Sequence, residues 1–183
     1  MTCNKHIDPT TYTTRPTDTR LEKEMKVYDL LEELKIPYIR IDHEAMDTIE
    51  DCHDVDKILG IDICKNLFLC NAQKTKFYLL MMPGNKKFVT RDFCKQIHSP
   101  RLSFAPAEYM EAYLGLTPGS VSVLGLMNDY DKHVQLVIDQ EVANKALMGC
   151  HPCINTSSLC LSTQDVLNKF LPYTGHDVMY VNL

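Results

Sequence analysis

Hydrophobic side chains recur at two different spacings along this chain. From Leu21 to Leu34 they return every three or four positions, which predicts a helix that ends before Pro37. Shorter apolar runs bounded by polar turns predict strands in the rest of the chain. The expected strands are 38–41, 66–70, 77–82, 121–126, 133–138, 156–161 and 178–181. The expected helices are 21–34, 47–59, 90–97, 107–114 and 162–171.

Two pairs of these strands are predicted to form hairpins, 66–70 with 77–82 and 121–126 with 133–138. The two runs of each pair are separated by a short polar turn, which is typical of antiparallel neighbours. Thr90 is expected to cap the helix that follows the first hairpin. Because helices are dispersed between hairpins, the sequence predicts a mixed α+β domain with a largely antiparallel sheet.

The length of 183 residues, with 45% hydrophobic and 23% charged side chains, suits one soluble domain with a real core. Residues 1–19 are polar and rich in threonine, so we expect a flexible extension there and a single domain over 20–183. No apolar run reaches the roughly 18 residues that a membrane span needs, and the N-terminus lacks a signal-peptide core. A cytoplasmic protein without a membrane partner is therefore expected.

The charge balance restricts how the chain meets nucleic acid. With 24 acidic and 19 basic residues the formal net charge is −5, which disfavours gripping long stretches of nucleic acid by bulk charge. Contact with a short nucleic-acid end stays open. The locally basic cluster Lys86, Lys87, Arg91, Lys95 and Arg101 is either a solvated face or a surface that meets phosphates.

Two stretches are candidates for binding chemistry. Lys65 and Asn66 open a very apolar run, where an ammonium group must stay in water or find an anion. Lys65 is therefore either a strand-end lysine reaching to solvent or an anchor for a phosphate or carboxylate. Around Gly119, small residues allow the backbone to approach a ligand closely, although the same pattern suits a turn that feeds a buried strand.

A third candidate stretch contains His151 and Pro152, which either line a pocket or hold a structural histidine. Cys150 and Cys153 form a Cys-x-x-Cys pair. A redox pair needs its first sulfur at a helix N-terminus, and a structural zinc needs a second matching ligand pair. Neither support is visible, and cysteines without an export signal are expected to be reduced thiols. The sequence predicts no metal and no cofactor.

Taken in order, five short motifs carry a family resemblance. They are Lys65-Asn66-Leu67-Phe68-Leu69, Arg101-Leu102-Ser103-Phe104-Ala105, Thr117-Pro118-Gly119-Ser120-Val121-Ser122, Val137-Ile138-Asp139, and His151-Pro152 followed by Asn155-Thr156. This order resembles the YbaK/ProX family of aminoacyl-tRNA deacylases, from about Leu21 to the C-terminus. The family shares its fold with the editing domain inserted in bacterial prolyl-tRNA synthetases. The lysine motif looks most like the branch that clears alanine from proline tRNA.

The resemblance implies hydrolysis of the ester that joins alanine to the terminal adenosine of tRNA(Pro). A synthetase pocket built for proline excludes alanine poorly, because a missing methylene is worth only ~1–3 kcal/mol. A second pocket that admits alanine and refuses proline would correct the error. The implied partners are the 3′ aminoacyl end of a mischarged tRNA and prolyl-tRNA synthetase. The alternatives are a deacylase of Cys- or Ser-charged tRNA and a catalytically silent module that senses tRNA or amino acid.

The resemblance also assigns roles to residues. It implies that Lys65 anchors the phosphate or ribose end of the tRNA, that the Gly119 loop offers backbone groups to the ester, and that His151 bounds the amino-acid pocket. The implied substrate-binding residues are Asn66, Ser120, Gly149, Pro152 and Asn155. A water molecule, helped by a ribose hydroxyl of the tRNA, is the implied nucleophile. Val123 stands where the family usually has proline, so the end of the glycine loop departs from the pattern.

Overall fold

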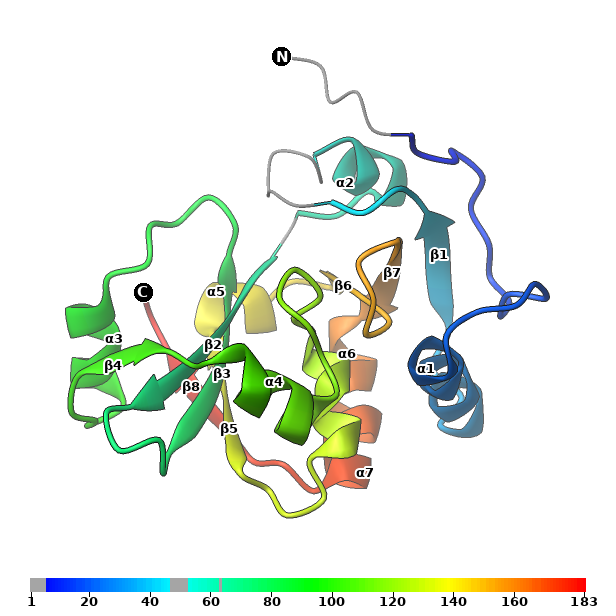
Figure 1. Ribbon diagram of the computed structural model, residues 1–183. Coiled ribbons are helices and arrows are strands. Elements are labelled where there is room, and N and C mark those ends of the chain that lie inside the picture. The colour runs from blue at the N-terminus through cyan, green and yellow to red at the C-terminus, as the bar shows by residue number, and fades with distance from the viewer. Residues whose placement is uncertain (1–5, 47–52, 63) are drawn as a thin grey trace.

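The computed structural model describes residues 6–46, 53–62 and 64–183 (Figure 1). Its strands are β1 (Tyr38–Asp42), β2 (Cys64–Asn71), β3 (Phe77–Pro83), β4 (Leu102–Phe104), β5 (Val134–Asp139), β6 (Leu147–Cys150), β7 (Ser157–Ser162) and β8 (Val178–Val181). Its helices are α1 (Glu22–Glu33), α2 (His53–Leu59), α3 (Thr90–Gln96), α4 (Ala107–Leu114), the 3₁₀ helix η2 (Val123–Asn128), α5 (Gln140–Ala143), α6 (Thr163–Asp165), the π-helix η3 (Val166–Phe170) and α7 (Leu171–Thr174).

Within the described ranges the strands form two sheets. The larger sheet has the order β4-β2-β3-β5-β8, and the smaller has the order β1-β7-β6. The smaller sheet is antiparallel throughout. In the larger sheet β2 is antiparallel to β3 and β4, whereas β5 is parallel to both β3 and β8. The protein is therefore an α+β domain with mixed, largely antiparallel sheets, which confirms the predicted fold class.

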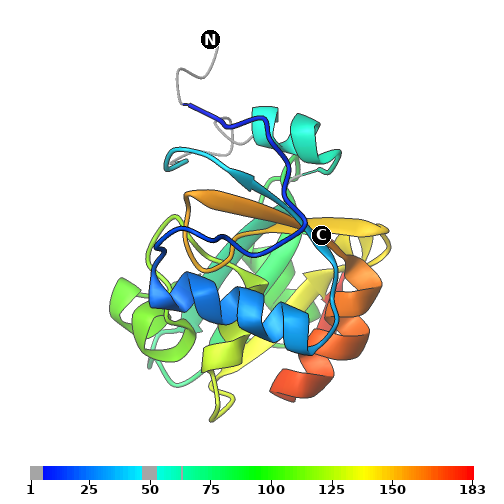
Figure 2. The ribbon, with the colours of Figure 1, turned by 90° about the vertical axis from the view of Figure 1, so that its right-hand side faces the viewer.

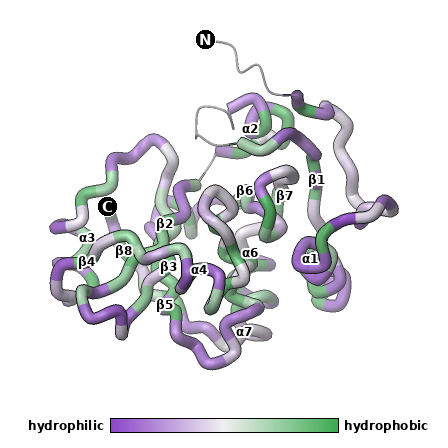
Figure 3. The backbone as a smooth tube through the Cα atoms, in the orientation of Figure 1, coloured by the Kyte–Doolittle hydropathy of each residue, from purple (hydrophilic) through white to green (hydrophobic). Residues whose placement is uncertain are grey.

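Both faces of the larger sheet are covered, and this explains why every residue of β3 is buried. On one face the main hydrophobic cluster joins β2, β3 and β5 to α1, α4, η2 and the segment from α6 to α7. On the other face a second cluster packs beneath α3. Figure 3 shows hydrophobic stretches along the inner strands and hydrophilic ones in the outer turns. The cluster that a side chain joins therefore shows on which face of the larger sheet it lies.

The described part of the predicted N-terminal extension, residues 6–19, lies beside β1 and leads toward α1 (Figure 2). The backbone of Tyr12 exchanges two hydrogen bonds with Arg40, at 2.8 and 2.7 Å. The Arg40 guanidinium lies 4.4 Å from the centre of the Tyr12 ring, and Arg15 pairs with Asp29 of α1. These contacts tie the segment to the domain along its length. The division of the chain into an extension and a domain at residue 19 stays a prediction.

The predicted hairpin of 121–126 with 133–138 is wrong. The first of its strands is replaced by η2, which begins where the Ser122 hydroxyl accepts a hydrogen bond from the Leu124 amide at 3.2 Å. The second strand is present as β5 but pairs in parallel with β3. Residues 122–126 are all buried, and in a fully buried run hydrophobicity does not distinguish a strand from a short helix.

Smaller differences concern element ends and two short strands. The sequence did not predict β4 or β6, and α3 is preceded by Val89 without a side-chain cap, so Thr90 is not its capping residue. Of the predicted helix 47–59, only α2 falls in the described part, and residues 47–52 lie outside it. The other helices and strands are confirmed to within a few residues. No described helix is long and apolar enough to cross a membrane.

Candidate functional site

Lys65 lies one residue inside β2, on the face of the larger sheet that α3 covers. Successive side chains of a strand alternate between faces, and Leu67 and Leu69 join the cluster beneath α3, so Lys65 shares their side. Its ammonium donates a hydrogen bond to the Lys86 carbonyl at 2.6 Å. No carboxylate among the described residues lies within ion-pair distance of it. The charge of Lys65 therefore stays available for an anion.

Asn66 faces the opposite side of β2, toward the main cluster. It is paired across the strands with Met81, which belongs to that cluster. Its side-chain Oδ1 is buried and has no hydrogen-bond partner in the described part of the chain. Leaving a buried acceptor unpaired costs about 1–3 kcal/mol, so such a group is suited to a donor brought by a ligand.

The glycine stretch forms a tight turn. Pro118 and Gly119 occupy its two central positions, the Ser120 amide donates to the Thr117 carbonyl at 3.0 Å, and Gly119 has a φ of +89°. That conformation is a type II turn, which needs glycine at its third position. The Ser120 hydroxyl donates to the Thr117 carbonyl at 2.8 Å and is buried, so it holds the turn together. The backbone around Gly119, which is exposed, is what the turn presents outward.

The glycine turn lies beside the loop that follows His151. A Cβ atom at Gly119 would lie 3.5 Å from the side-chain nitrogen of Asn155. Val123, the departure from the family pattern, begins η2 and is completely buried in the main cluster. Packing of the Val123 side chain therefore fixes the residues after the turn. In relatives with proline at this position, the proline ring would restrict the backbone instead.

His151 is partly buried, and its neighbour Pro152 is buried. The His151 Nδ1 donates to the Ser157 carbonyl at 3.0 Å, so the neutral ring carries its lone pair on Nε2. The ring of His43 lies edge-on to it, with 6.4 Å between ring centres. Burial lowers the pKa of both histidines, which favours the neutral ring in each.

The sequence did not identify Ser158, whose hydroxyl lies 2.9 Å from Nε2 of His43. His43 Nδ1 donates to the Glu44 carbonyl at 2.8 Å, so Ser158 is the donor to the unprotonated Nε2. A serine beside a histidine has the composition of a nucleophile and its base. Both side chains are buried, at 8% and 7% exposure. No spacing in the sequence indicates this pair, because β1 and β7 bring together residues far apart in the chain.

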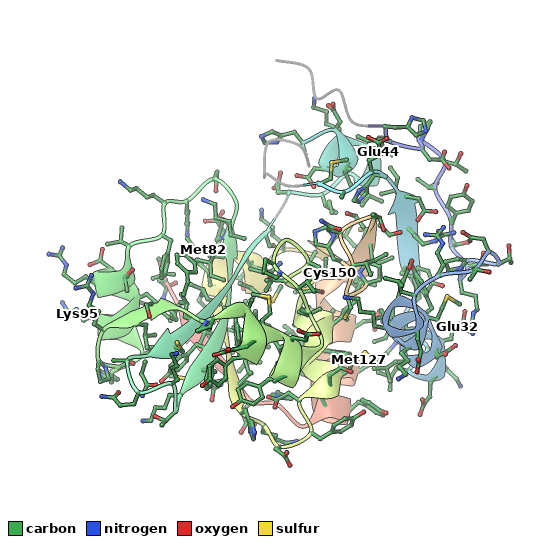
Figure 4. The ribbon with its side chains drawn as sticks, viewed as in Figure 1. Glu32, Glu44, Met82, Lys95, Met127 and Cys150 are labelled. Atoms are coloured by element: carbon green, nitrogen blue, oxygen red, sulfur yellow. The ribbon has the colours of Figure 1, made fainter. Side chains whose placement is uncertain are left out.

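Cys150 is the last residue of β6 in the smaller sheet and lies near the middle of the molecule as viewed in Figure 4. Burial raises the pKa of its thiol, as do the neighbouring thiols of Cys153 and Cys64, while a hydrogen bond from Ser122 opposes the shift. Cys64 precedes Lys65 in β2, and Ser122 follows the glycine turn. Cys150 thus joins all three candidate stretches, although Lys65 itself points to the other face of its strand.

The Cys150–Cys153 pair is poorly suited to thiol chemistry. Burial raises the pKa of Cys153 to about 12 and also raises that of Cys150. Redox and nucleophilic reactions use the thiolate, which such thiols rarely form near neutral pH. Within the described ranges, no group of three or more His, Cys, Asp or Glu side chains is arranged to hold a metal ion.

A cavity of about 710 Å³ opens beside the first residues of β2. Its walls come from α2 and the residues after it, from the turn 83–85, and from the α5 region. Ile61 in this lining lies against Gly149, where an added Cβ atom would come within 2.3 Å of the tip of Ile61. The lining includes Pro83, the partner of Cys64 in the sheet, but does not include Lys65, Gly119 or His151.

Residues 43–169 match the family model described as an aminoacyl-tRNA editing domain, which covers more than half of the chain. The chain belongs to the aminoacyl-tRNA editing domain family. Membership confirms the resemblance inferred from the motif order.

Individual relatives agree with this assignment. The prolyl-tRNA editing protein ProX of Acetoanaerobium sticklandii is 33% identical over 164 residues, which cover 89% of this chain and 99% of the relative. Prolyl-tRNA synthetase associated domain-containing protein 1 of Danio rerio is 27% identical over 164 residues, covering 88% and 85%. A solved structure described as a candidate trans-editing enzyme for prolyl-tRNA synthetase shares the fold, with a TM-score of 0.64 and 13% identity over 90% of this chain and 99% of the other.

Within this aminoacyl-tRNA editing domain, the fold unites most of the predicted site. Gly119 lies against Asn155, and Cys150, the last residue of β6 and the residue before His151, lies near Cys64 of β2. Lys65 is directed instead toward the turn after β3, where the Lys86 carbonyl receives it. The roles assigned to these residues stay predictions.

Proposed function

We propose that this protein is a free-standing hydrolase that removes alanine from mischarged tRNA(Pro), correcting an error of prolyl-tRNA synthetase. Its family, and the name of the bacterial relative that it matches over nearly their whole lengths, support the class of reaction. The observation that carries the proposal is the ammonium of Lys65, which has no carboxylate partner in the described chain and is bound by the Lys86 carbonyl, one residue after the turn 83–85 that lines a cavity of about 710 Å³.

Lys65 binds the 3′ end of the tRNA in this proposal. One of its three N–H groups is used by the Lys86 carbonyl, which leaves two for a phosphate or ribose oxygen. The hydrogen bond to Lys86 also holds the ammonium in a fixed position before the substrate arrives. On the other face of β2, the unpaired side-chain oxygen of Asn66 accepts a hydrogen bond from the substrate.

Water is the proposed nucleophile. It attacks the ester carbonyl carbon, the bond from that carbon to the ribose oxygen breaks, and the ribose oxygen takes a proton, giving alanine and free tRNA. The neighbouring ribose hydroxyl orients the water, and the backbone around Gly119 stabilises charge on the carbonyl oxygen. The hydroxyl of Ser120 is held within its own turn and the Cys150 thiol is protonated, which supports water over a side-chain nucleophile.

Size exclusion provides the selectivity. Proline must be refused, because an enzyme that hydrolysed Pro-tRNA(Pro) would destroy the correct product. In this proposal the amino acid lies beside His151, which its hydrogen bond to the Ser157 carbonyl holds in place, while Ile61 fills the space that a side chain at position 149 would need. Rigid walls reject an added ring more strongly than a flexible pocket does.

The deciding experiment incubates the purified protein with tRNA(Pro) carrying alanine, serine, cysteine or proline and measures amino-acid release. We expect alanine to be released fastest and proline to remain attached. Release of cysteine or serine ahead of alanine would contradict the assigned substrate. Release of no amino acid above the uncatalysed rate would favour the second candidate, a silent module that senses tRNA, which the loss of the family proline at Val123 makes worth testing.

The mechanism has a test of its own in Ser158→Ala, which removes the hydroxyl beside His43. If water is the nucleophile, this variant keeps its rate within a few-fold of the unmodified protein. Loss of hydrolysis in a folded variant, together with an acyl-serine intermediate in the unmodified protein, would show that Ser158 is the nucleophile instead. The structure of the variant is checked by its circular dichroism spectrum.

A further inference from the structure

An aromatic ring stands exposed at the edge of the larger sheet. Phe104 is the last residue of the edge strand β4, and 66% of its surface is exposed. Its ring lies 6.5 Å from that of Phe88, which in turn packs 5.8 Å from the buried Phe93 of α3. The ring of Phe104 therefore has Phe88 as a neighbour and leaves most of its surface exposed to solvent.

Three exposed cations belong to the segments that carry Phe88 and Phe104. Lys87 and Arg101 are exposed, and neither has a carboxylate within ion-pair distance among the residues that the structure describes. Arg91 on α3 is 90% exposed and has Asp92 as a weak partner at 3.5 Å. Positive charge is thus concentrated here in a chain whose net charge is −5.

The turn between β3 and α3 links this edge to the proposed active site. Its first residues, 83–85, line the cavity, and the carbonyl of Lys86 holds Lys65. Its later residue Phe88 contacts the ring of Phe104. Phe104 is paired with Leu69, which is four residues along β2 from Lys65, or about 13 Å. Residues of this one turn therefore reach both the cavity and the exposed ring.

We propose that Phe104, Phe88, Lys87, Arg91 and Arg101, which we name the β4 surface, bind the unpaired 3′ nucleotides of the tRNA. This inference rests on the proposed function for the identity of the RNA. An exposed ring stacks on an unpaired base of any sequence, and nearby cations hold the phosphates. A paired stem offers no free base face to Phe104. The distance of about 13 Å to Lys65 suits a strand of a few nucleotides that ends in the cavity.

The experiment uses an uncharged RNA minihelix of the tRNA(Pro) acceptor stem, made with and without its unpaired 3′ nucleotides. Binding to Phe104→Ala should be about tenfold weaker than binding to the unmodified protein, and only for the RNA with the unpaired end. Phe104→Trp, which keeps a stacking ring, should restore binding. Tyr130→Ala is the matched control, because Tyr130 is 84% exposed and lies outside the β4 surface.

A second measurement tests the cations. Replacing Arg101 or Lys87 by alanine should reduce the slope of log affinity against log salt by about one for each phosphate that the variant no longer neutralises. Lys26→Ala is the control, because Lys26 is 58% exposed but is paired with Glu22 on α1. It should leave the slope unchanged.

Because the RNA carries no amino acid, these results are independent of catalysis. Equal binding by Phe104→Ala and the unmodified protein would overturn the β4 surface even if alanine is released from Ala-tRNA(Pro). Equal weakening of binding for both minihelices would also overturn it, since the ring would then contact the stem. If no alanine is released but the weakening still depends on the unpaired end, the proposed hydrolysis fails and the β4 surface stands as an RNA site.

Discussion

Two regions of this protein differ in whether their cations have carboxylate partners; we call the paired region closed and the unpaired region open. At the junction of the N-terminal segment with β1, Arg20 and Arg40 both bind Asp42, at 3.0 Å for Arg20, and Ser157 donates a further hydrogen bond to that carboxylate at 2.6 Å. Glu24 lies 3.4 Å from Arg20 and completes the network. Elsewhere, Lys65 and the β4-surface residues Lys87 and Arg101 have no ion-pair partner in the described chain, and Arg91 has only the exposed Asp92 at 3.5 Å.

The difference separates charges that hold the fold from charges that are available to a ligand. A buried cation must be paired, because taking a charge out of water is costly. Arg40 is only 4% exposed and is therefore bound to Asp42. Cations at the surface can be left unpaired at little cost, and a chain with net negative charge has many carboxylates to offer them. That Lys65 and Arg101 are left without one supports their use by an external anion.

The largest effect is expected where the closed network is broken. Asp42→Ala leaves Arg20 and the buried Arg40 without their shared carboxylate. We expect the free energy of unfolding to fall by about 3 kcal/mol, since removing one partner strands a buried charge. Urea unfolding measures the change.

The matched control is Asp92→Ala, which removes the carboxylate of the exposed pair with Arg91. An exposed pair contributes at most about 1 kcal/mol, so this variant should unfold almost as the unmodified protein does. Equal stability of the two variants would mean that the network around Asp42 is no more important to the fold than a surface pair.

The next largest effect is expected from substituting Lys65, in the open region. Lys65→Met keeps the length of the side chain and removes its charge. Hydrogen bonds to charged groups contribute about 2 kcal/mol, so kcat/KM for Ala-tRNA(Pro) should fall about thirtyfold with little loss of stability. Deacylation assays at several substrate concentrations measure it.

Lys169→Met is the control for this change. Lys169 also donates to a backbone carbonyl, that of Lys35 at 3.0 Å, but is paired with Asp165 at 2.8 Å. It should keep the full rate. If both variants deacylate equally, the lack of an ion pair at Lys65 has no functional meaning.

The sequence indicated residues of the open region, such as Lys65, but not the ion pairs of the closed region. The order of five motifs, among them those that contain Lys65, Gly119 and His151, was enough to indicate the family, and the pattern of helices and strands indicated the fold class. The pairing of Arg40 with Asp42 was not visible, because ion pairs depend on which strands become neighbours. The direction of Lys65 away from Cys150 was also missed, since a strand's faces are fixed only when both of its covering layers are known.

Local pattern also failed where burial is complete. The run 121–126 has the composition of a strand but becomes η2, because its residues are buried from every side. By contrast, a turn at Gly119 was one of the two interpretations that the sequence left open, and the structure has a turn there, followed by η2 rather than by the expected strand. Signals that act within a few residues were readable, and those that depend on the packed sheet were not.

The smallest effect is expected from the two neutral histidines, which belong to the closed region. Burial lowers the pKa of His43 and His151, so between that value and the ordinary value near 6.5 the unfolded chain binds more protons than the folded one. Stability therefore rises with pH through this window. It is fully present above about pH 6.5 and is lost as the pH falls below it.

His151→Asn tests this reasoning, because asparagine can still donate to the Ser157 carbonyl but does not titrate. The difference in unfolding free energy between pH 7.5 and pH 5.5 should be smaller for the variant than for the unmodified protein. His6→Asn is the control, because it makes the same substitution at an exposed histidine. An unchanged slope in His151→Asn would mean that His151 is open enough to water to accept a proton in the folded state. It would then belong with Lys65 among the groups available to the substrate.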